Sequence, residues 1–311
     1  MKVKFGTSIA LVRTTRRANG SYNIGDRGIH PCGVIIMRLD DAPESSNVED
    51  SRGMGGKLAL GGGGVVLLIL GLIFGVDLGG NKPGNSGNPG KKDEATLHFT
   101  QKILGTTEKV WEKEFRDQKY PAYRPPHLEL FSDRVQTGCG NAPAAVGPFY
   151  CPADQKVYID PTFFDELAQK LGGSKADFSK AYVIAHEVGH HVQKLLGYSA
   201  RVDAHRGKPD EKDYSVRLEL QADYLAGVWA YHGQREFNFI EKGDVDEAIK
   251  TANSIGDDRL QKRSGGFVHP EQFTHGTSEQ RKKWFLDGLK TGDASRMKLD
   301  HFFEVKSSKD L

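Results

Sequence analysis

Apolar residues recur at helical spacing in the middle of the chain. In residues 177–196, Val183, Val188 and neighbouring apolar side chains form the faces of a helix that Gly197 can end. Residues 217–230 repeat the pattern with leucine, alanine and tryptophan. Because apolar side chains surround much of each helix, we expect both helices to be buried.

The rest of the pattern predicts a mixed fold. We expect further helices in residues 99–115, 244–262 and 278–290, and short strands in residues 128–131 and 156–160. Long helices combined with a few short strands predict an α+β fold that is mainly helical and has a small β-sheet.

An uncharged apolar run occupies residues 58–76. It nearly reaches the roughly 20 residues that cross a bilayer as a helix. A signal peptide and a core helix are the alternatives, but the run begins far from the N-terminus and no cleavage site follows it. We therefore expect one transmembrane helix that precedes the folded domain. Arg52 and Lys57 lie just before it, which favours a single-pass protein whose folded domain is periplasmic or otherwise extracytoplasmic.

This run divides the chain into segments of different composition. We expect residues 1–57 to form a disordered N-terminal segment, residues 77–92 a flexible linker rich in Gly and Asn, and residues 93–311 the folded domain. The apolar run within residues 1–36 is too short for a signal peptide, and we expect translation to start at Met37.

Charge and cysteine content narrow the class of protein. The net charge is only +2, from 43 basic and 41 acidic residues, so no nucleic-acid partner is expected. Cys139 and Cys151 enclose a short loop with Gly, Pro and Asn, which favours a disulfide in an oxidising compartment. Two inert buried thiols and a separate structural metal site are the alternatives.

The first buried helix carries the sequence His186-Glu187-Val188-Gly189-His190. Its spacing places both imidazoles on one helical face, where they can ligate one metal ion. Glu187 lies about 100° round the helix axis and can polarise water on that ion. This is the zincin arrangement of two nitrogen ligands, a general base and an open coordination position. A core helix with two hydrogen-bonded histidines is the alternative.

A catalytic zinc ion usually takes a third protein ligand. Glu219 and Asp223 lie one turn apart on the second buried helix. We expect Glu219 to ligate the metal and Asp223 to accept the outer N–H of a ligating histidine. A solvated acidic pair is the alternative for these two residues. His191 and Cys151 compete for the third position, but His191 points about 100° away from His190, and a disulfide would remove the Cys151 thiolate.

Several segments together resemble the bacterial family of putative neutral zinc metallopeptidases, the YpfJ type. The matching segments are residues 104–111, 137–140, 147–154, 157–160, 181–193, 219–223 and 275–281. The resemblance implies a membrane-anchored, single-domain zincin with peptidase activity, and similarity to other membrane peptidases supports Glu219 as a ligand. It also suggests His275 and Arg281, and more weakly Tyr224, as groups that stabilise the oxyanion. Taken without the resemblance, His275 is equally well a loop residue beside a helix cap.

These observations predict hydrolysis of a peptide or protein substrate with one Zn²⁺ ion, held by His186, His190 and Glu219. Glu187 is the expected general base. No protein partner is identifiable. In zincins a strand beside the active helix pairs with the substrate backbone; Val157–Ile159 is the candidate edge strand, with a buried central strand as the other interpretation. A non-catalytic zinc scaffold and a zinc amidase or deformylase that uses Cys151 are the alternative functions.

Overall fold

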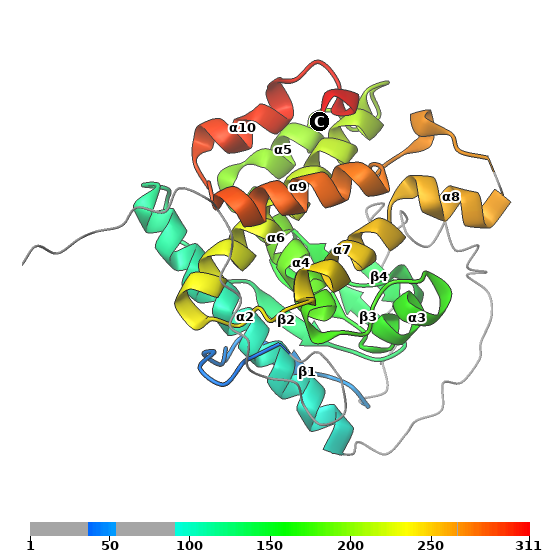
Figure 1. The fold of residues 1–311 in the computed structure, drawn as a ribbon. Helices are drawn as coiled ribbons and strands as arrows, with labels where there is room; N and C mark the ends of the chain where they lie inside the picture. Colours follow the sequence, from blue (N-terminus) through cyan, green and yellow to red (C-terminus); the bar gives the residue numbers. More distant parts are fainter. Residues whose placement is uncertain (1–36, 54–90, 266) are drawn as a thin grey trace, which may run out of the picture.

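The computed structural model describes residues 37–53, 91–265 and 267–311 (Figure 1). The helices are α2 (Lys91–Asp117), α3 (Thr162–Lys170), α4 (Asp177–Leu196), α5 (Tyr198–Asp203), α6 (Glu211–Phe237), α7 (Asp244–Ser254), α8 (Asp257–Gly265), α9 (Ser278–Thr291) and α10 (Arg296–Glu304). The strands are β1 (Val48–Asp50), β2 (His127–Leu130), β3 (Arg134–Thr137), β4 (Gly140–Pro143), β5 (Phe149–Cys151) and β6 (Lys156–Ile159). Short 3₁₀ turns are η2 (Ala144–Val146), η3 (Pro270–Gln272) and η4 (Ser308–Asp310). The predicted α+β class, mainly helical with small sheets, is confirmed.

The expected single-pass membrane localisation needs correction. Across the described ranges, none of the helices combines the length and the apolar character that a membrane crossing requires. The segment for which a transmembrane helix was predicted, residues 58–76, lies outside the described residues, as do the predicted start of the linker and residues 1–36.

A four-stranded sheet, in the order β1-β2-β6-β5, forms one side of the domain. β1, β2 and β6 are parallel, and β5 is antiparallel to β6. Residues 37–53 were expected to be disordered, yet β1 pairs with β2 and Met37 is only 3% exposed in the core. The prediction of disorder is therefore wrong for this segment. Its own sequence is polar, but β1 is ordered by backbone pairing with β2, which is distant in the sequence.

The position of β6 decides between the two interpretations of Val157–Ile159. β6 lies between β2 and β5, and all three residues are buried. The edge-strand prediction is wrong and the central-strand interpretation is right. The edges of the sheet are β1 and β5, and the predicted disulfide, present between Cys139 and Cys151, joins β5 to the end of the β3–β4 hairpin.

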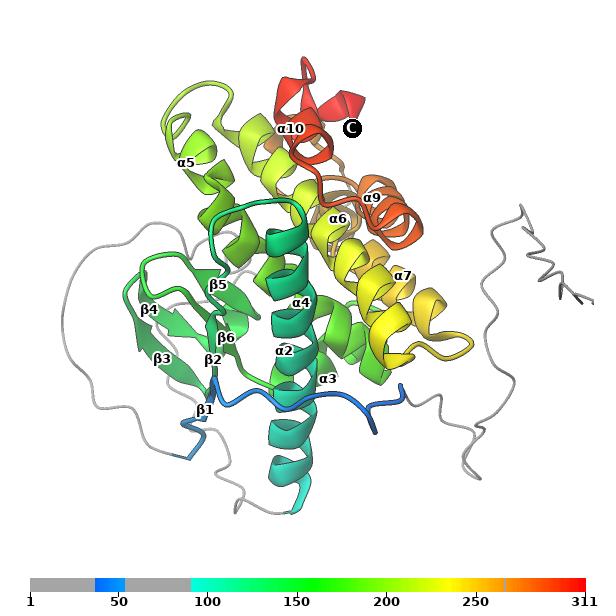
Figure 2. The ribbon, with the colours of Figure 1, turned by 90° about the vertical axis from the view of Figure 1, so that its left-hand side faces the viewer.

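The helices α4, α6 and α9 lie in succession beyond the sheet (Figure 2). α4 packs against β5 and β6 and against α6, while α9 packs along α6 and contacts α4 where Phe285 meets Tyr182. Two glycines permit the contact between α6 and α9: a Cβ atom at Gly227 would collide with the Phe285 carbonyl oxygen, and one at Gly288 with the Tyr224 carbonyl oxygen. The backbones of α6 and α9 therefore approach closely, which brings polar residues of α9 into the core beside α4.

Candidate metal centre

Three side chains from α4 and α6 converge at one point. The ligand atoms that His186, His190 and Glu219 offer all lie within 4.8 Å of one another. Nε2 of His186 is 3.3 Å from Oε2 of Glu219, and Nε2 of His190 is 3.4 Å from Oε1. Zinc bonds of about 2.0–2.1 Å at tetrahedral angles place neighbouring ligand atoms roughly 3.4 Å apart. The two imidazoles and the carboxylate therefore fit a zinc ion in both chemistry and spacing.

The outer nitrogens of both histidines are held by hydrogen bonds. Nδ1 of His186 donates to Oδ1 of Asp223 at 2.9 Å, and Nδ1 of His190 donates to Oε1 of Gln193 at 2.8 Å. The Gln193 amide is oriented in turn, because its Nε2 donates to the Leu218 carbonyl oxygen at 2.6 Å. With Nδ1 carrying the proton, each Nε2 presents its lone pair toward Glu219, as a metal ligand must.

Gly189 sets the distance between these two helices. A Cβ atom at this position would lie 3.1 Å from the Ala222 carbonyl oxygen and 3.3 Å from its Cα. Both contacts are closer than a side chain tolerates without a shift of its neighbour. A residue without a side chain between the two histidines thus lets α6 bring Glu219 and Asp223 up to α4.

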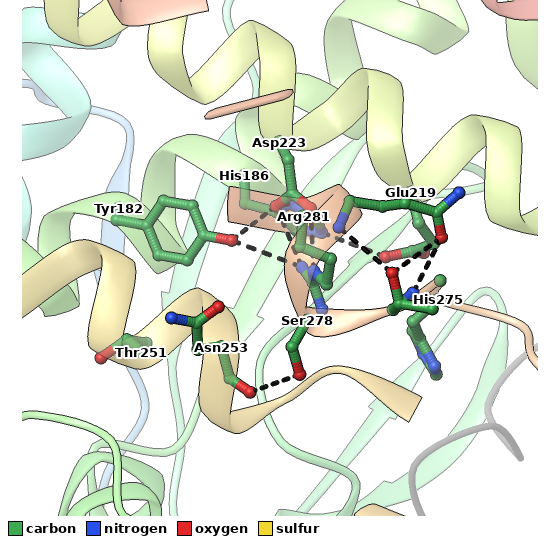
Figure 3. A network of polar contacts seen from close by, with 12 residues as sticks. Tyr182, His186, Glu219, Asp223, Thr251, Asn253, His275, Ser278 and Arg281 are labelled. Atoms are coloured by element: carbon green, nitrogen blue, oxygen red, sulfur yellow. Dashed lines mark hydrogen bonds and ion pairs between the residues drawn. The ribbon is translucent and has the colours of Figure 1, made fainter. Parts of the chain in front are cut away.

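Asp223 is the centre of a buried polar network (Figure 3). Besides His186, its carboxylate accepts hydrogen bonds from Arg281 Nε at 2.8 Å, from Arg281 Nη2 at 3.0 Å and from the Tyr182 hydroxyl at 2.5 Å. Burial opposes the charge of Asp223, but Arg281 and His186 outweigh it and lower the pKa of Asp223. Arg281, which was considered as an oxyanion-stabilising group, therefore has its guanidinium bound to Asp223.

Glu187 lies in the wall of a cavity of about 580 Å³, together with His186, His190 and Glu219. The residue is 8% exposed. Burial raises the pKa of Glu187 to about 7; His186 opposes this rise and the nearby Glu219 carboxylate adds to it. A carboxylate with a pKa near neutrality both accepts and returns a proton readily at that pH, as a general base requires.

His275 lines the same cavity from the loop before α9. Its Nδ1 contacts Oδ1 of Asp257 at 3.0 Å, and the other carboxylate oxygen of Asp257 accepts the backbone N–H groups of Thr274 and His275, both at 2.6 Å. Burial disfavours the charged imidazole, but Asp257 and Glu219 outweigh it and raise the pKa of His275. The loop thus presents to the cavity an imidazole whose protonated form Asp257 and Glu219 favour.

Three other candidates lie away from the cluster of His186, His190 and Glu219. Nε2 of His191 donates to the Arg124 carbonyl oxygen at 2.6 Å, and its Nδ1 contacts the Tyr150 hydroxyl at 3.0 Å. The Tyr224 hydroxyl donates to the Asp293 carbonyl oxygen at 2.7 Å, beyond α9. Cys151 is bonded to Cys139 and has no thiolate to offer. None of the three belongs to the converging group.

The sequence interpretation missed Tyr182, Gln193 and Asp257. Gln193 follows His190 by one helical turn, and Tyr182 precedes His186 by one turn, so helical spacing could have suggested both. Asp257 follows Gly256 inside the stretch that was predicted as a single helix, residues 244–262. The structure breaks that stretch into α7 and α8, and Asp257 begins α8.

Comparison with known proteins agrees with this geometry. Residues 37–298 match the family described as "Putative neutral zinc metallopeptidase". The chain is 42% identical over 282 residues to the protein YpfJ of Escherichia coli, which covers 84% of this chain and 97% of that relative.

A second relative, from Mycobacterium bovis, is 45% identical over 182 residues, which is 56% of this chain and 61% of the relative. Both relatives are described as uncharacterized. No solved structure matches the chain. Because the family match covers most of the chain, the protein belongs to the family of putative neutral zinc metallopeptidases.

Proposed function

We propose that the protein hydrolyses peptide bonds with one zinc ion held by His186, His190 and Glu219. The observation that carries this proposal is the position of Glu187. Its buried carboxylate lines the same cavity as the three converging ligands. A structural zinc site closes its coordination shell with four ligands and needs no base beside it. Three ligands at a cavity wall therefore favour catalysis over a scaffold role.

The chemistry divides between the ion and the chain. Zinc, when bound, lowers the pKa of water and polarises a carbonyl group. Glu187 accepts the proton of the attacking water and passes it to the leaving amine. His275, held by Asp257, donates a hydrogen bond where negative charge develops on the carbonyl oxygen. Asp223 and Gln193 keep the two ligating imidazoles in the required tautomer.

The substrate backbone has a place beside β5. This strand is one of the two edges of the sheet, and it is the edge beside the cavity, which Pro148, Phe149 and Tyr150 line. The unpaired backbone groups of an edge strand bind an extended peptide by adding it as a further strand. We therefore assign to β5 the substrate-aligning role that the sequence interpretation had given to Val157–Ile159.

The test uses the full chain loaded with zinc and a mixture of peptides with varied residues at each position. Glu187→Gln should abolish cleavage, to below about one hundredth of the wild-type rate, and should still bind one zinc ion per chain. Glu166→Gln is the control, because the Glu166 side chain is 51% exposed on α3 and does not line the cavity. It should cleave normally. Cleavage by Glu187→Gln at the wild-type rate would refute the proposed role of Glu187 as base.

A further inference from the structure

The cavity has an apolar end. Phe163, Leu171, Val183, Ile255 and Leu260 line it there, and we call these five residues the apolar pocket. They come from α3, the residue after it, α4, the residue after α7, and α8. Leu171 is 7% exposed, Val183 6% and Leu260 2%, so their side chains are supported by the core behind them.

The opposite end of the cavity has a different character. Asp203, Arg206, Glu211 and Lys212 line it, near the C-terminal end of α4. The five residues of the apolar pocket include no charged or hydrogen-bonding side chain. A ligand that occupies the whole cavity therefore meets apolar walls on one side of the metal ligands and charged groups on the other.

The apolar pocket adjoins the atoms that would react. Val183 precedes His186 by one turn of α4, which corresponds to about 5 Å along the helix axis. The pocket and the ligand cluster belong to one continuous cavity. A group that enters the pocket must therefore be attached to the substrate close to the bond that is cleaved.

We propose that the apolar pocket binds the large aliphatic or aromatic side chain of a substrate residue next to the scissile bond. This inference rests on the proposed function and specifies its substrate class. A Leu or Phe side chain loses contact with water in the pocket, which favours binding in proportion to the apolar area covered. A charged side chain would lose its hydration there without gaining a partner. Peptides with Leu or Phe at this position should be cleaved about 10–100-fold more efficiently than their Ala counterparts.

The experiment compares two variants that narrow opposite ends of the cavity. Ile255→Trp fills the apolar pocket, and Val202→Trp places the same side chain at the charged end; both positions are partly exposed and line the cavity. The first readout is kcat/KM for pairs of peptides that differ only in Leu or Ala beside the cleaved bond. Ile255→Trp should reduce the preference for Leu to about twofold or less, while Val202→Trp should keep it.

The second readout needs no turnover. Calorimetry measures the binding, to the zinc-loaded full chain, of a hydroxamate with an isobutyl group next to its zinc-binding group and of the same compound without that group. The isobutyl compound should bind at least about tenfold more tightly, and Ile255→Trp should remove this difference. If Ile255→Trp does not fold, Phe163→Ala opens the half-buried wall of the pocket and should weaken the same difference.

The two readouts separate the two proposals. Cleavage that depends on Glu187 but shows no preference for Leu, with equal binding of both hydroxamates, overturns the apolar pocket and leaves the proposed function in place. Absence of any cleavage that depends on Glu187 overturns the proposed function. In that case the ratio of hydroxamate affinities still supports or refutes the pocket by itself.

Discussion

Replacing Asp223 by alanine should destabilise the metal-free protein strongly. Asp223 is fully buried, and Arg281, which donates two hydrogen bonds to it, is 3% exposed. The guanidinium group stays protonated at any pH at which the protein folds. In Asp223→Ala a buried positive charge therefore loses its hydrogen-bonded counter-ion, and Tyr182 and His186 lose their acceptor.

The magnitude follows from the burial of both partners. Removing one member of a buried ion pair costs about 3–5 kcal/mol, a large share of the roughly 5–15 kcal/mol that stabilises a typical domain. Removing both charges costs much less, because no unpaired ion remains. The double variant Asp223→Ala/Arg281→Met should thus be more stable than Asp223→Ala, and the coupling energy of the pair should reach at least about 2 kcal/mol.

Urea-induced unfolding, followed by circular dichroism in the presence of a chelator, measures the four free energies of this cycle. Glu166→Ala is the matched control, because Glu166 pairs with Lys170 at 2.8 Å on the surface, where the two side chains are 51% and 66% exposed. This change should cost less than about 0.5 kcal/mol. Strictly additive effects of Asp223→Ala and Arg281→Met would refute the reasoning, since additivity means that the two charges do not stabilise each other.

Three further outcomes are expected. Gln193→Leu should weaken zinc binding about 10–100-fold in a chelator competition, because the outer nitrogen of His190 loses its acceptor; unchanged affinity would contradict this. Gly227→Ala should lower the free energy of unfolding by about 1–3 kcal/mol, since α6 and α9 must separate, and an unchanged urea midpoint would count against the close contact.

The third outcome concerns pH. Burial raises the pKa of Asp244 to about 6, above the unfolded value of 3.8, so the folded state penalises the charged form. The contribution of Asp244 to stability should then rise as the pH falls from 7 through 6 toward 4, and the difference in stability between the wild type and Asp244→Asn should shift in favour of the wild type over that range. Parallel urea titrations of both proteins across that pH range would detect the difference; identical pH profiles would contradict it.

The apolar periodicity of the sequence predicted the two helices that carry the candidate site. It did not predict strands whose structure depends on pairing with distant segments of the chain. α4 and α6 were visible because apolar residues repeat over several turns. β5 was not predicted as a strand, and that β5 rather than β6 lies at an edge of the sheet depends on which strands pair in space. β1 was missed because three residues, with Val48 as the only apolar one, acquire their structure by pairing with β2.

In the candidate site, too, helical spacing predicted some residues and could not predict others. Helical spacing placed His186 and His190 on one face of α4, and Glu219 and Asp223 on one face of α6. Asp257 and Arg281 could not be placed in this way. Asp257 contacts His275 across a loop, and Arg281 reaches Asp223 only because α9 crosses α6 closely at Gly227. Contacts between elements depend on packing that local spacing does not encode.

Glu219 and Asp223 lie one turn apart on α6 but face different surroundings, and this difference predicts opposite effects. The Glu219 side chain is 19% exposed at the cavity wall, whereas that of Asp223 is fully buried. Loss of an outer hydrogen-bond partner lowers metal affinity by about 10–100-fold. Glu219→Gln should therefore lower zinc affinity by at least that factor. It should lower the unfolding free energy of the metal-free protein by less than Asp223→Ala does, because Glu219 faces His186 and His190, which can lose a proton, whereas the Arg281 guanidinium beside Asp223 cannot. Zinc titration and urea unfolding on the same samples test both expectations. Full zinc affinity in Glu219→Gln would show that α6 supplies no ligand, and a loss of stability as large as that of Asp223→Ala would show that Glu219 stabilises the fold instead.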